Sequence, residues 1–367
     1  MSLRTVDPTL TPGARMPASA AGSDSGEDPT IAERLVDALA RPDGSAALRP
    51  VHATGNGATG SFAPSDVAHK FCKASHFRRG CSPVRATVRF SNGSGCATRH
   101  DGWSDVRGMA TRFHLADGSA TDLIAMTLRE FFAPDAYSFL RFAVAAKPRH
   151  FKSTSWLGKI WDYLNLRLPV RDAYPGEVIR PDEGAVAFAN QHDYAQLAVF
   201  DAASIGAPVS YARASYHAVH TFVLTAPDGT RRYVRFSWLP TVGVLNTDPL
   251  AVPVDRYLER ELHRRIAAGP VHFNLMMVLG EAGDDFDDST RPWPPHRRRV
   301  FMGTLTLDKL LDDDICERLN FNPWLLPDGI GPSNDPVLRV RKEAYEISGR
   351  RRGAAACPCA RRDDHAA

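Results

Sequence analysis

A strict alternation of apolar and polar side chains runs through the stretch Val84-Arg85-Ala86-Thr87-Val88-Arg89-Phe90. A repeat of two residues is typical of a β-strand, because successive side chains point to opposite faces of a sheet. Turn residues further along the chain predict two hairpins. Their strands are expected over 108–115 and 120–126, and over 216–226 and 230–239. Another strand is expected over 271–279.

Helical patterns flank these strands in the sequence. Thr30 and Glu33 form a capping-box pattern, and apolar residues follow at four-residue spacing from Ile31, so a short helix is predicted over 31–40. Residues 305–319 also have a helical pattern. The order of elements, with one short helix, many antiparallel strands and then helices, is typical of an α+β fold.

No repeat or obvious linker divides the chain, so we expect one domain over 28–353. The N-terminal residues 1–27 are rich in Pro, Ser, Gly and Ala and are expected to be disordered. Residues 354–367 are expected to form a flexible tail. Within the domain, residues 150–195 are predicted to be a long irregular excursion, a kind of segment that often covers a cavity.

Composition excludes several classes of protein. The 367 residues hold 45 Lys and Arg against 42 Asp and Glu, a net charge of +3, so nothing indicates a nucleic-acid binder. The six cysteines form no CxxC pair, so a structural zinc site lacks its usual spacing. The sequence has no apolar signal segment and no run long enough to span a membrane. A cytoplasmic protein is therefore expected.

Two places in the chain could carry chemistry. Arg341 and Tyr345 are four residues apart and would share one face of a helix. A guanidinium that touches a phenol oxygen favours the phenolate, which can bind ferric iron. By itself, however, the pair also fits an ordinary helix contact. His52, in a Gly- and Ala-rich segment, alone fits a structural or surface histidine equally well.

Taken together and in order, six segments of the sequence resemble the haem catalase family. They are 49–58, 84–91, 105–113, 122–135, 216–222 and 321–335, and the last of these leads into Arg341 and Tyr345. The resemblance covers about 45–353. It implies an eight-stranded antiparallel β-barrel surrounded by helices, with haem b at its edge and a C-terminal helix that carries the iron ligand.

The resemblance also implies roles for individual residues. His52 would be the distal acid–base residue, Tyr345 the proximal iron ligand, and Arg341 the partner of its phenolate. Asp105 matches an aspartate of the peroxide channel in larger catalases. Five more residues would surround the cofactor, namely three arginines at the haem propionates, a serine bonded to the distal histidine and a phenylalanine over the ring: Arg49, Arg89, Arg352, Ser91 and Phe139.

One position departs from the family pattern. The distal asparagine of the family falls on Met126, and a thioether cannot donate a hydrogen bond to peroxide. The adjacent Thr127 would point to the opposite face of a strand. Loss of one such donor can lower a rate by ~10²-fold or more, so weak catalase activity is expected.

The length of the chain fits the haem-binding core alone, which is similar to the small, catalase-related peroxidases. We therefore expect a haem peroxidase that reduces hydrogen peroxide or organic hydroperoxides with a small organic electron donor. Two alternatives stay open: an enzyme that rearranges lipid hydroperoxides, in the manner of an allene oxide synthase, and a non-catalytic haem-binding protein. The sequence also leaves a homo-oligomer open.

Overall fold

The computed structural model describes residues 29–40, 49–95, 99–103, 105–146, 157, 160, 184–248 and 254–353. Within them, eight antiparallel strands close into a barrel. Around the ring they follow the order β1 (Gly55–Pro64), β2 (Val84–Asn92), β3 (Arg107–His114), β4 (Ala120–Met126), β5 (Tyr216–His217), β7 (Arg231–Pro240), β8 (Val271–Leu279) and β9 (Arg299–Leu311), and β9 pairs with β1. β6 (Phe222–Thr225) pairs with β7 beyond β5, and β10 (Ile330–Pro332) pairs with β6.

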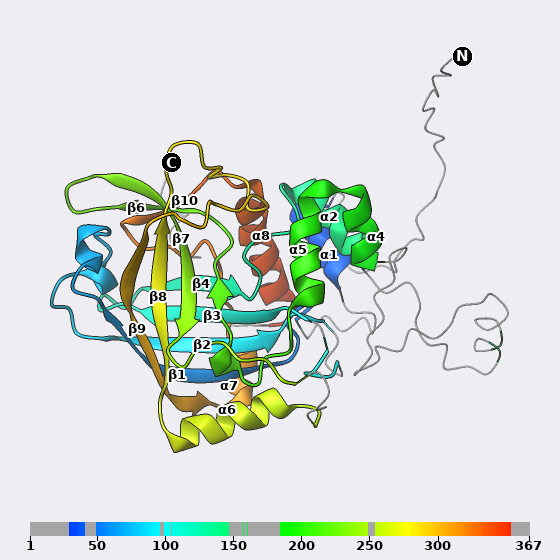
Figure 1. The fold of residues 1–367 in the computed structure, drawn as a ribbon, viewed down its shortest axis with the longest axis horizontal. Coiled ribbons are helices and arrows are strands. Elements are labelled where there is room, and N and C mark those ends of the chain that lie inside the picture. The colour runs from blue at the N-terminus through cyan, green and yellow to red at the C-terminus, as the bar shows by residue number, and fades with distance from the viewer. Residues whose placement is uncertain are drawn as a thin grey trace, which may run out of the picture.

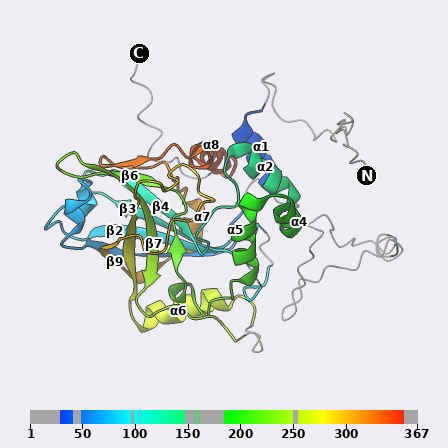
Figure 2. The same cartoon turned by 45° about the horizontal axis from the view of Figure 1, so that its top comes forward.

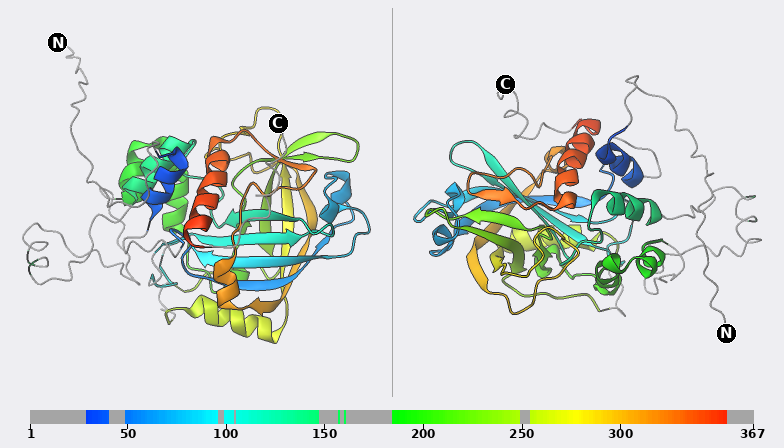
Figure 3. Two further views of the ribbon diagram at one scale, coloured as in Figure 1. Left: turned by 180° about the vertical axis from the view of Figure 1, so that it is seen from behind. Right: turned by 90° about the horizontal axis from the view of Figure 1, so that it is seen from above.

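Helices lie beside the barrel and across one of its ends (Figure 1). The lateral group contains α1 (Ile31–Leu39), α2 (Ala136–Ala145), α4 (Gly184–Gln191) and α5 (Asp193–Ser204). Between this group and the barrel wall stands α8 (Pro336–Arg351), as the view from behind also shows (Figure 3). The end of the barrel is crossed by α6 (Tyr257–Ala268), seen at the bottom of Figure 2, whereas α7 (Asp313–Arg318) follows β9.

Three short 3₁₀ helices complete the described structure: η1 (Ala68–Lys70), η2 (Ser75–Phe77) and η3 (Tyr211–Arg213). None of the helices in the described ranges is long and apolar enough to cross a membrane.

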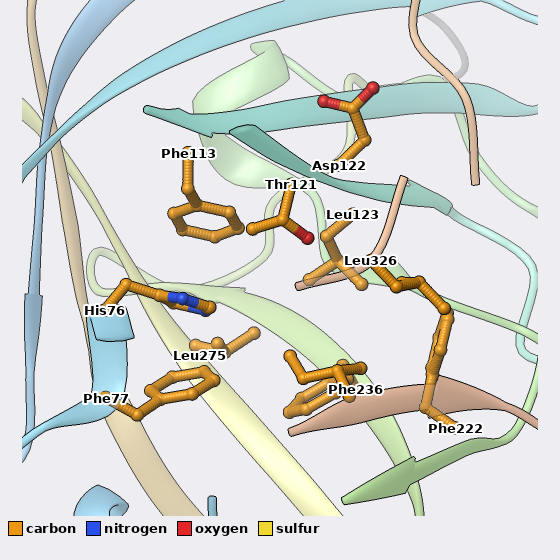
Figure 4. Close-up of a pocket in the computed structure, with 11 residues that line it drawn as sticks. His76, Phe77, Phe113, Thr121, Asp122, Leu123, Phe222, Phe236, Leu275 and Leu326 are labelled. Atoms are coloured by element: carbon orange, nitrogen blue, oxygen red, sulfur yellow. The ribbon is translucent and has the colours of Figure 1, made fainter. Parts of the chain in front are cut away.

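The interior of the barrel is a packed aromatic core (Figure 4). Phe62 contacts Phe113 and Trp238 edge to face, and His76 stacks on Phe113 with ring centroids 5.2 Å apart. Burial lowers the pKa of His76 from 6.5 to about 3, so this imidazole is a neutral core group. The cavity beside it measures about 20 Å³, room for one water molecule. This cavity therefore has no room for a larger ligand.

A glycine permits the barrel to close. The β1–β9 register shifts at Gly60, where a Cβ atom would lie 1.9 Å from the carbonyl oxygen of Thr306. Only a residue without a side chain allows the two backbones to approach so closely at this irregularity.

Most elements predicted from local pattern are confirmed. The helix over 31–40 is α1, with the capping box between Thr30 and Glu33. The strands predicted around 84–90, 108–126 and 271–279 are β2, the β3–β4 hairpin and β8.

Three predictions about secondary structure were wrong in part. The first part of the segment 305–319 is strand, because Leu305 and Leu307 of β9 face the barrel core and pair with β1 and β8; the helix is limited to α7. The strand expected over 216–226 is interrupted at 218–221. The end of the predicted irregular excursion, from 184 onwards, is the helical pair α4 and α5. The rest of that excursion, apart from two isolated residues, and both predicted tails lie outside the described residues.

A buried ion pair fixes the segment that leads to α8. Arg112 donates from Nε and Nη2 to the two carboxylate oxygens of Asp122, each over 2.7 Å. The same groups also bind the main chain of this segment, since Arg112 donates to the carbonyl of Asn320 and Asp122 accepts from the amide of Asn322. The β3–β4 hairpin thus positions the chain just before α8.

We expect Asp122→Asn to lower the free energy of unfolding by ~3 kcal/mol, because removing one partner leaves the other charge buried without its counter-ion. Denaturant unfolding followed by circular dichroism measures this loss. Asp308→Asn, at an exposed position on β9, is the matched control and should change stability little. Equal stability of the two variants would contradict the role given to the pair.

Candidate active site

Helix α8, which lies outside the barrel, carries an arginine and a tyrosine on one of its faces. Arg341 and Tyr345 lie one turn apart, and Nη2 of Arg341 donates a hydrogen bond to the Tyr345 oxygen over 2.9 Å. The guanidinium carbon also lies 5.3 Å from the centroid of the Tyr345 ring. The two predicted proximal residues are therefore in contact, with a positive charge beside the phenol oxygen.

Behind Arg341 stand two residues whose roles the sequence did not reveal. His220 Nε2 lies 2.7 Å from Nη1 of Arg341, and His220 Nδ1 lies 2.6 Å from Oδ2 of Asp335. Burial lowers the pKa of His220, against the opposing charge of Asp335. For Asp335, burial is outweighed by His220 and by two backbone amides, and its pKa is lowered. The pair is thus a neutral imidazole and a carboxylate.

Asp335 also begins the helix. Its Oδ1 accepts from the amides of Val337 and Leu338, which is a side-chain cap, and Pro336 occupies the first helical turn. One carboxylate thus sets the start of α8 and the orientation of His220. The Asp-Pro dipeptide was the one sequence signal for this role.

His52 lies in the loop before β1 and is held at three points. Its amide donates to the carbonyl of Gly93, its carbonyl accepts from Arg89, and its Nδ1 lies 2.9 Å from Oγ of Ser91. The backbone has φ 56°, a left-handed conformation that is strained for histidine and is maintained by these contacts. Ser91 therefore engages Nδ1, which leaves Nε2 for a ligand.

Burial, with the charges of Arg89, Arg341 and Arg49 added, lowers the pKa of His52 from 6.5 to about 3. The imidazole is therefore neutral over the ordinary pH range and can accept a proton.

A glycine on β3 makes room for the His52 ring. A Cβ atom at Gly108 would lie 2.9 Å from both Nδ1 and Cε1 of His52 and 2.8 Å from Oγ of Ser91. Gly108 pairs directly with Ser91 on one side and with Met126 on the other. Met126 therefore lies on the outer barrel face next to His52. The hydroxyl oxygen of the adjacent Thr127 accepts from the amide of Arg107 on β3.

Three arginines meet at one corner of the site around Glu317. Arg49 and Arg89 both donate to the Glu317 carboxylate, and Arg352, at the end of α8, donates to its carbonyl over 3.2 Å. Burial together with the neighbouring guanidinium groups lowers the pKa of Arg49 from 12.5 to about 9. Glu317 was not predicted, because no local motif marks it.

This arginine corner has the features of an anion site. Three guanidinium groups and one carboxylate leave it with a net charge of +2. The Nε atoms of Arg89 and Arg352 are buried and have no hydrogen-bond partner among the described residues. Buried donors of this kind call for an acceptor. The corner therefore suits a ligand with two carboxylates.

An aromatic group from α2 and the preceding loop covers the same region. Phe139 contacts Phe131 and Phe132 edge to face, with ring centroids 5.1 and 5.3 Å apart. This cluster also contains Met126 and Ala344 of α8, so residues from the distal and proximal sides belong to one apolar region. Such a wall can pack against a flat macrocycle.

Asp105 lies beside the distal loop. It accepts from the amide of Ser94 and pairs with Arg107 over 3.4 Å. No group of three His, Cys, Asp or Glu side chains that could hold a bare metal ion occurs in the described residues.

Comparison with known proteins decides the family. The family model described as catalase matches residues 34–170 and 185–357. This chain belongs to the catalase family. The matched range contains both sides of the site, from His52 to Tyr345, and the family consists of haem-binding oxidoreductases that act on peroxide.

Individual relatives agree with this assignment. A catalase-related peroxidase of Mycolicibacterium paratuberculosis is 30% identical over 339 residues, which are 89% of this chain and 97% of that protein. A catalase-related peroxidase of Synechococcus elongatus is 28% identical and covers 81% of each chain. A fungal catalase structure shares the fold, with a TM-score of 0.69 over 85% of this chain and 61% of its own, at 22% identity.

The low pKa of His52 predicts a particular pH profile for this catalase-family protein. A histidine with a lowered pKa is neutral above that value, so kcat/KM for peroxide should be level from pH 5 to 8 and fall only in stronger acid. Initial rates measured across this range test the prediction. An acid limb with its midpoint near the ordinary histidine pKa of ~6.5 would contradict it.

Proposed function

We propose that the protein is a haem b peroxidase that reduces hydrogen peroxide or organic hydroperoxides with a small organic electron donor. One observation carries the proposal: the structure combines a neutral histidine held by a serine, a tyrosine held by an arginine, and a cationic corner whose Arg89 binds the His52 carbonyl and whose Arg352 lies at the end of α8. The length of the matched relatives supports the small peroxidase branch, since the chain spans nearly the whole of the first of them.

The residues present fit haem b. Tyr345 would bind the iron, with Arg341 stabilising the phenolate, and Phe139 would lie over the ring. Arg49, Arg89 and Arg352 would receive the two propionates, whose two negative charges balance the +2 of the arginine corner. The unpartnered Nε donors of Arg89 and Arg352 supply hydrogen bonds for this purpose.

His52 would move the proton. Its neutral imidazole accepts the proton of the inner peroxide oxygen and returns it to the outer oxygen, so that water or an alcohol leaves. Ser91 fixes the ring orientation during this transfer, and Gly108 lets the ring lie against the barrel wall. Bound haem would supply the iron that holds the peroxide and the electrons that its O–O bond takes up.

The distal side favours peroxidase over catalase activity. Oxidation of a second hydrogen peroxide molecule benefits from an amide donor beside the histidine, and Met126 offers none. Thr127 follows Met126 directly, and its hydroxyl oxygen accepts from the main chain of β3. A non-catalytic haem-binding protein would have no need of the strained, triply held His52, and this arrangement supports an enzyme.

We expect Tyr345→Phe to lower haem retention by about tenfold or more, since even outer partners of a metal ligand change affinity by that much. The absorption spectrum after reconstitution and desalting measures haem content. Tyr137→Phe, at an exposed position on α2, is the matched control and should retain haem normally. Equal retention by both variants would contradict the ligand role of Tyr345.

Met126→Asn should raise the rate of oxygen evolution from hydrogen peroxide, by up to ~10²-fold, because it restores a hydrogen-bond donor beside His52. An oxygen electrode measures this rate, and oxidation of an organic donor is followed in parallel. Met276→Asn, three strands further round the barrel, serves as the control. An unchanged rate in Met126→Asn would show that this side chain does not face the peroxide.

A further inference from the structure

One row of residues runs around the outer face of the barrel through the distal site. Direct pairing places Ser91, Gly108, Met126, His217, Ser237 and Met276 next to one another on successive strands. Neighbours in such a row lie ~5 Å apart. The Met126 side chain is therefore the first one beyond the space that the His52 ring occupies over Gly108.

Met126 can also be reached by a small molecule. It is half-buried and packs against the aromatic cluster of Phe131, Phe132 and Phe139. Three other methionines of the described chain, Met109, Met277 and Met302, are fully buried. Met276 is half-buried like Met126, but it lies three strands further along the row, at ~14 Å by strand spacing.

We propose that Met126 is a modification site. Its side chain is oxidised to methionine sulfoxide by the peroxide that the protein binds over His52. This inference rests on the proposed function, because it requires peroxide to bind over His52. A thioether is readily oxidised by peroxide. With peroxide bound over His52, the Met126 sulfur on the neighbouring strand would lie beside the reacting oxygens, and such proximity raises the effective concentration of a reactant.

The chemistry of the step is balanced. The sulfur lone pair attacks the nearer peroxide oxygen, an S–O bond forms and the O–O bond breaks. The other oxygen leaves with the proton that His52 returns to it, as water or an alcohol. Sulfur loses two electrons and the peroxide gains them, so no further reductant or oxidant is needed.

The product would change the pocket. A sulfoxide is polar and accepts hydrogen bonds but donates none. It therefore places a new acceptor beside His52 in a wall that is otherwise apolar. Continued exposure to peroxide should lower the activity of the protein gradually. Met126→Leu has no sulfur to oxidise at this position, so it should keep a larger fraction of its initial rate over the same time.

The test uses haem-loaded full-length protein, checked by its absorption spectrum, and hydrogen peroxide as the probe. After brief exposure, tryptic digestion yields residues 113–129 with Met126 as the sole methionine. We expect one added oxygen on this peptide at least ~10-fold faster than on the peptide with Met276, since only Met126 is positioned. His52→Gln should slow the modification of Met126 and leave that of Met276 unchanged.

The outcomes separate the two proposals. If haem is not retained, the proposed function fails and this inference fails with it. If haem is bound and peroxide is consumed, but Met126 and Met276 are oxidised at equal rates or Met126 is spared, the self-oxidation proposal alone is overturned. Oxidation of Met126 that does not depend on His52 would also overturn it, because the proton transfer would then have no part in the step.

Discussion

The carboxylate of Asp335 connects the fold to the chemistry of the site. One of its oxygens caps α8 and the other binds His220, which in turn holds Arg341 against Tyr345. The start of the helix and the position of the phenol oxygen are therefore set by the same group. Asp335 and His220 are buried, so the contact between them forms in a low-dielectric interior, where it is stronger than at the surface.

Charge organises the other end of α8. Arg352 near the end of this helix, Arg49 before the distal histidine and Arg89 on β2 would repel one another in a buried corner, and Glu317 offsets only part of their charge. The corner therefore keeps a net positive charge beside the loop of His52.

Sequence patterns predicted the parts of the fold whose signal is local. The alternation at β2, the capping box of α1 and the turns of the β3–β4 hairpin depend on neighbouring residues, and all three are present. β1 was missed because its Gly- and Ala-rich sequence has little strand preference of its own and depends on pairing with β2 and β9. The end of β9 was mistaken for a helix because its strand conformation depends on pairing with the distant strands β1 and β8.

The candidate site likewise contains contacts that were predicted and contacts that were missed. The contacts of Arg341 with Tyr345 and of His52 with Ser91 were expected from the family resemblance. The contact of His220 with Asp335 joins residues 115 positions apart, and Glu317 gains its importance only through two arginines from distant segments. Long-range electrostatic partners of this kind leave no periodic trace in a sequence.

The alternation along β4 has a consequence for how this protein can change. Leu123 and Ala125 face the barrel core, whereas Met126 faces the site. A substitution at 126 therefore alters the chemistry of the pocket without opening a cavity in the core, and a substitution at 123 or 125 does the reverse. Selection can thus adjust the reaction at one position while the stability of the barrel is maintained by its neighbours.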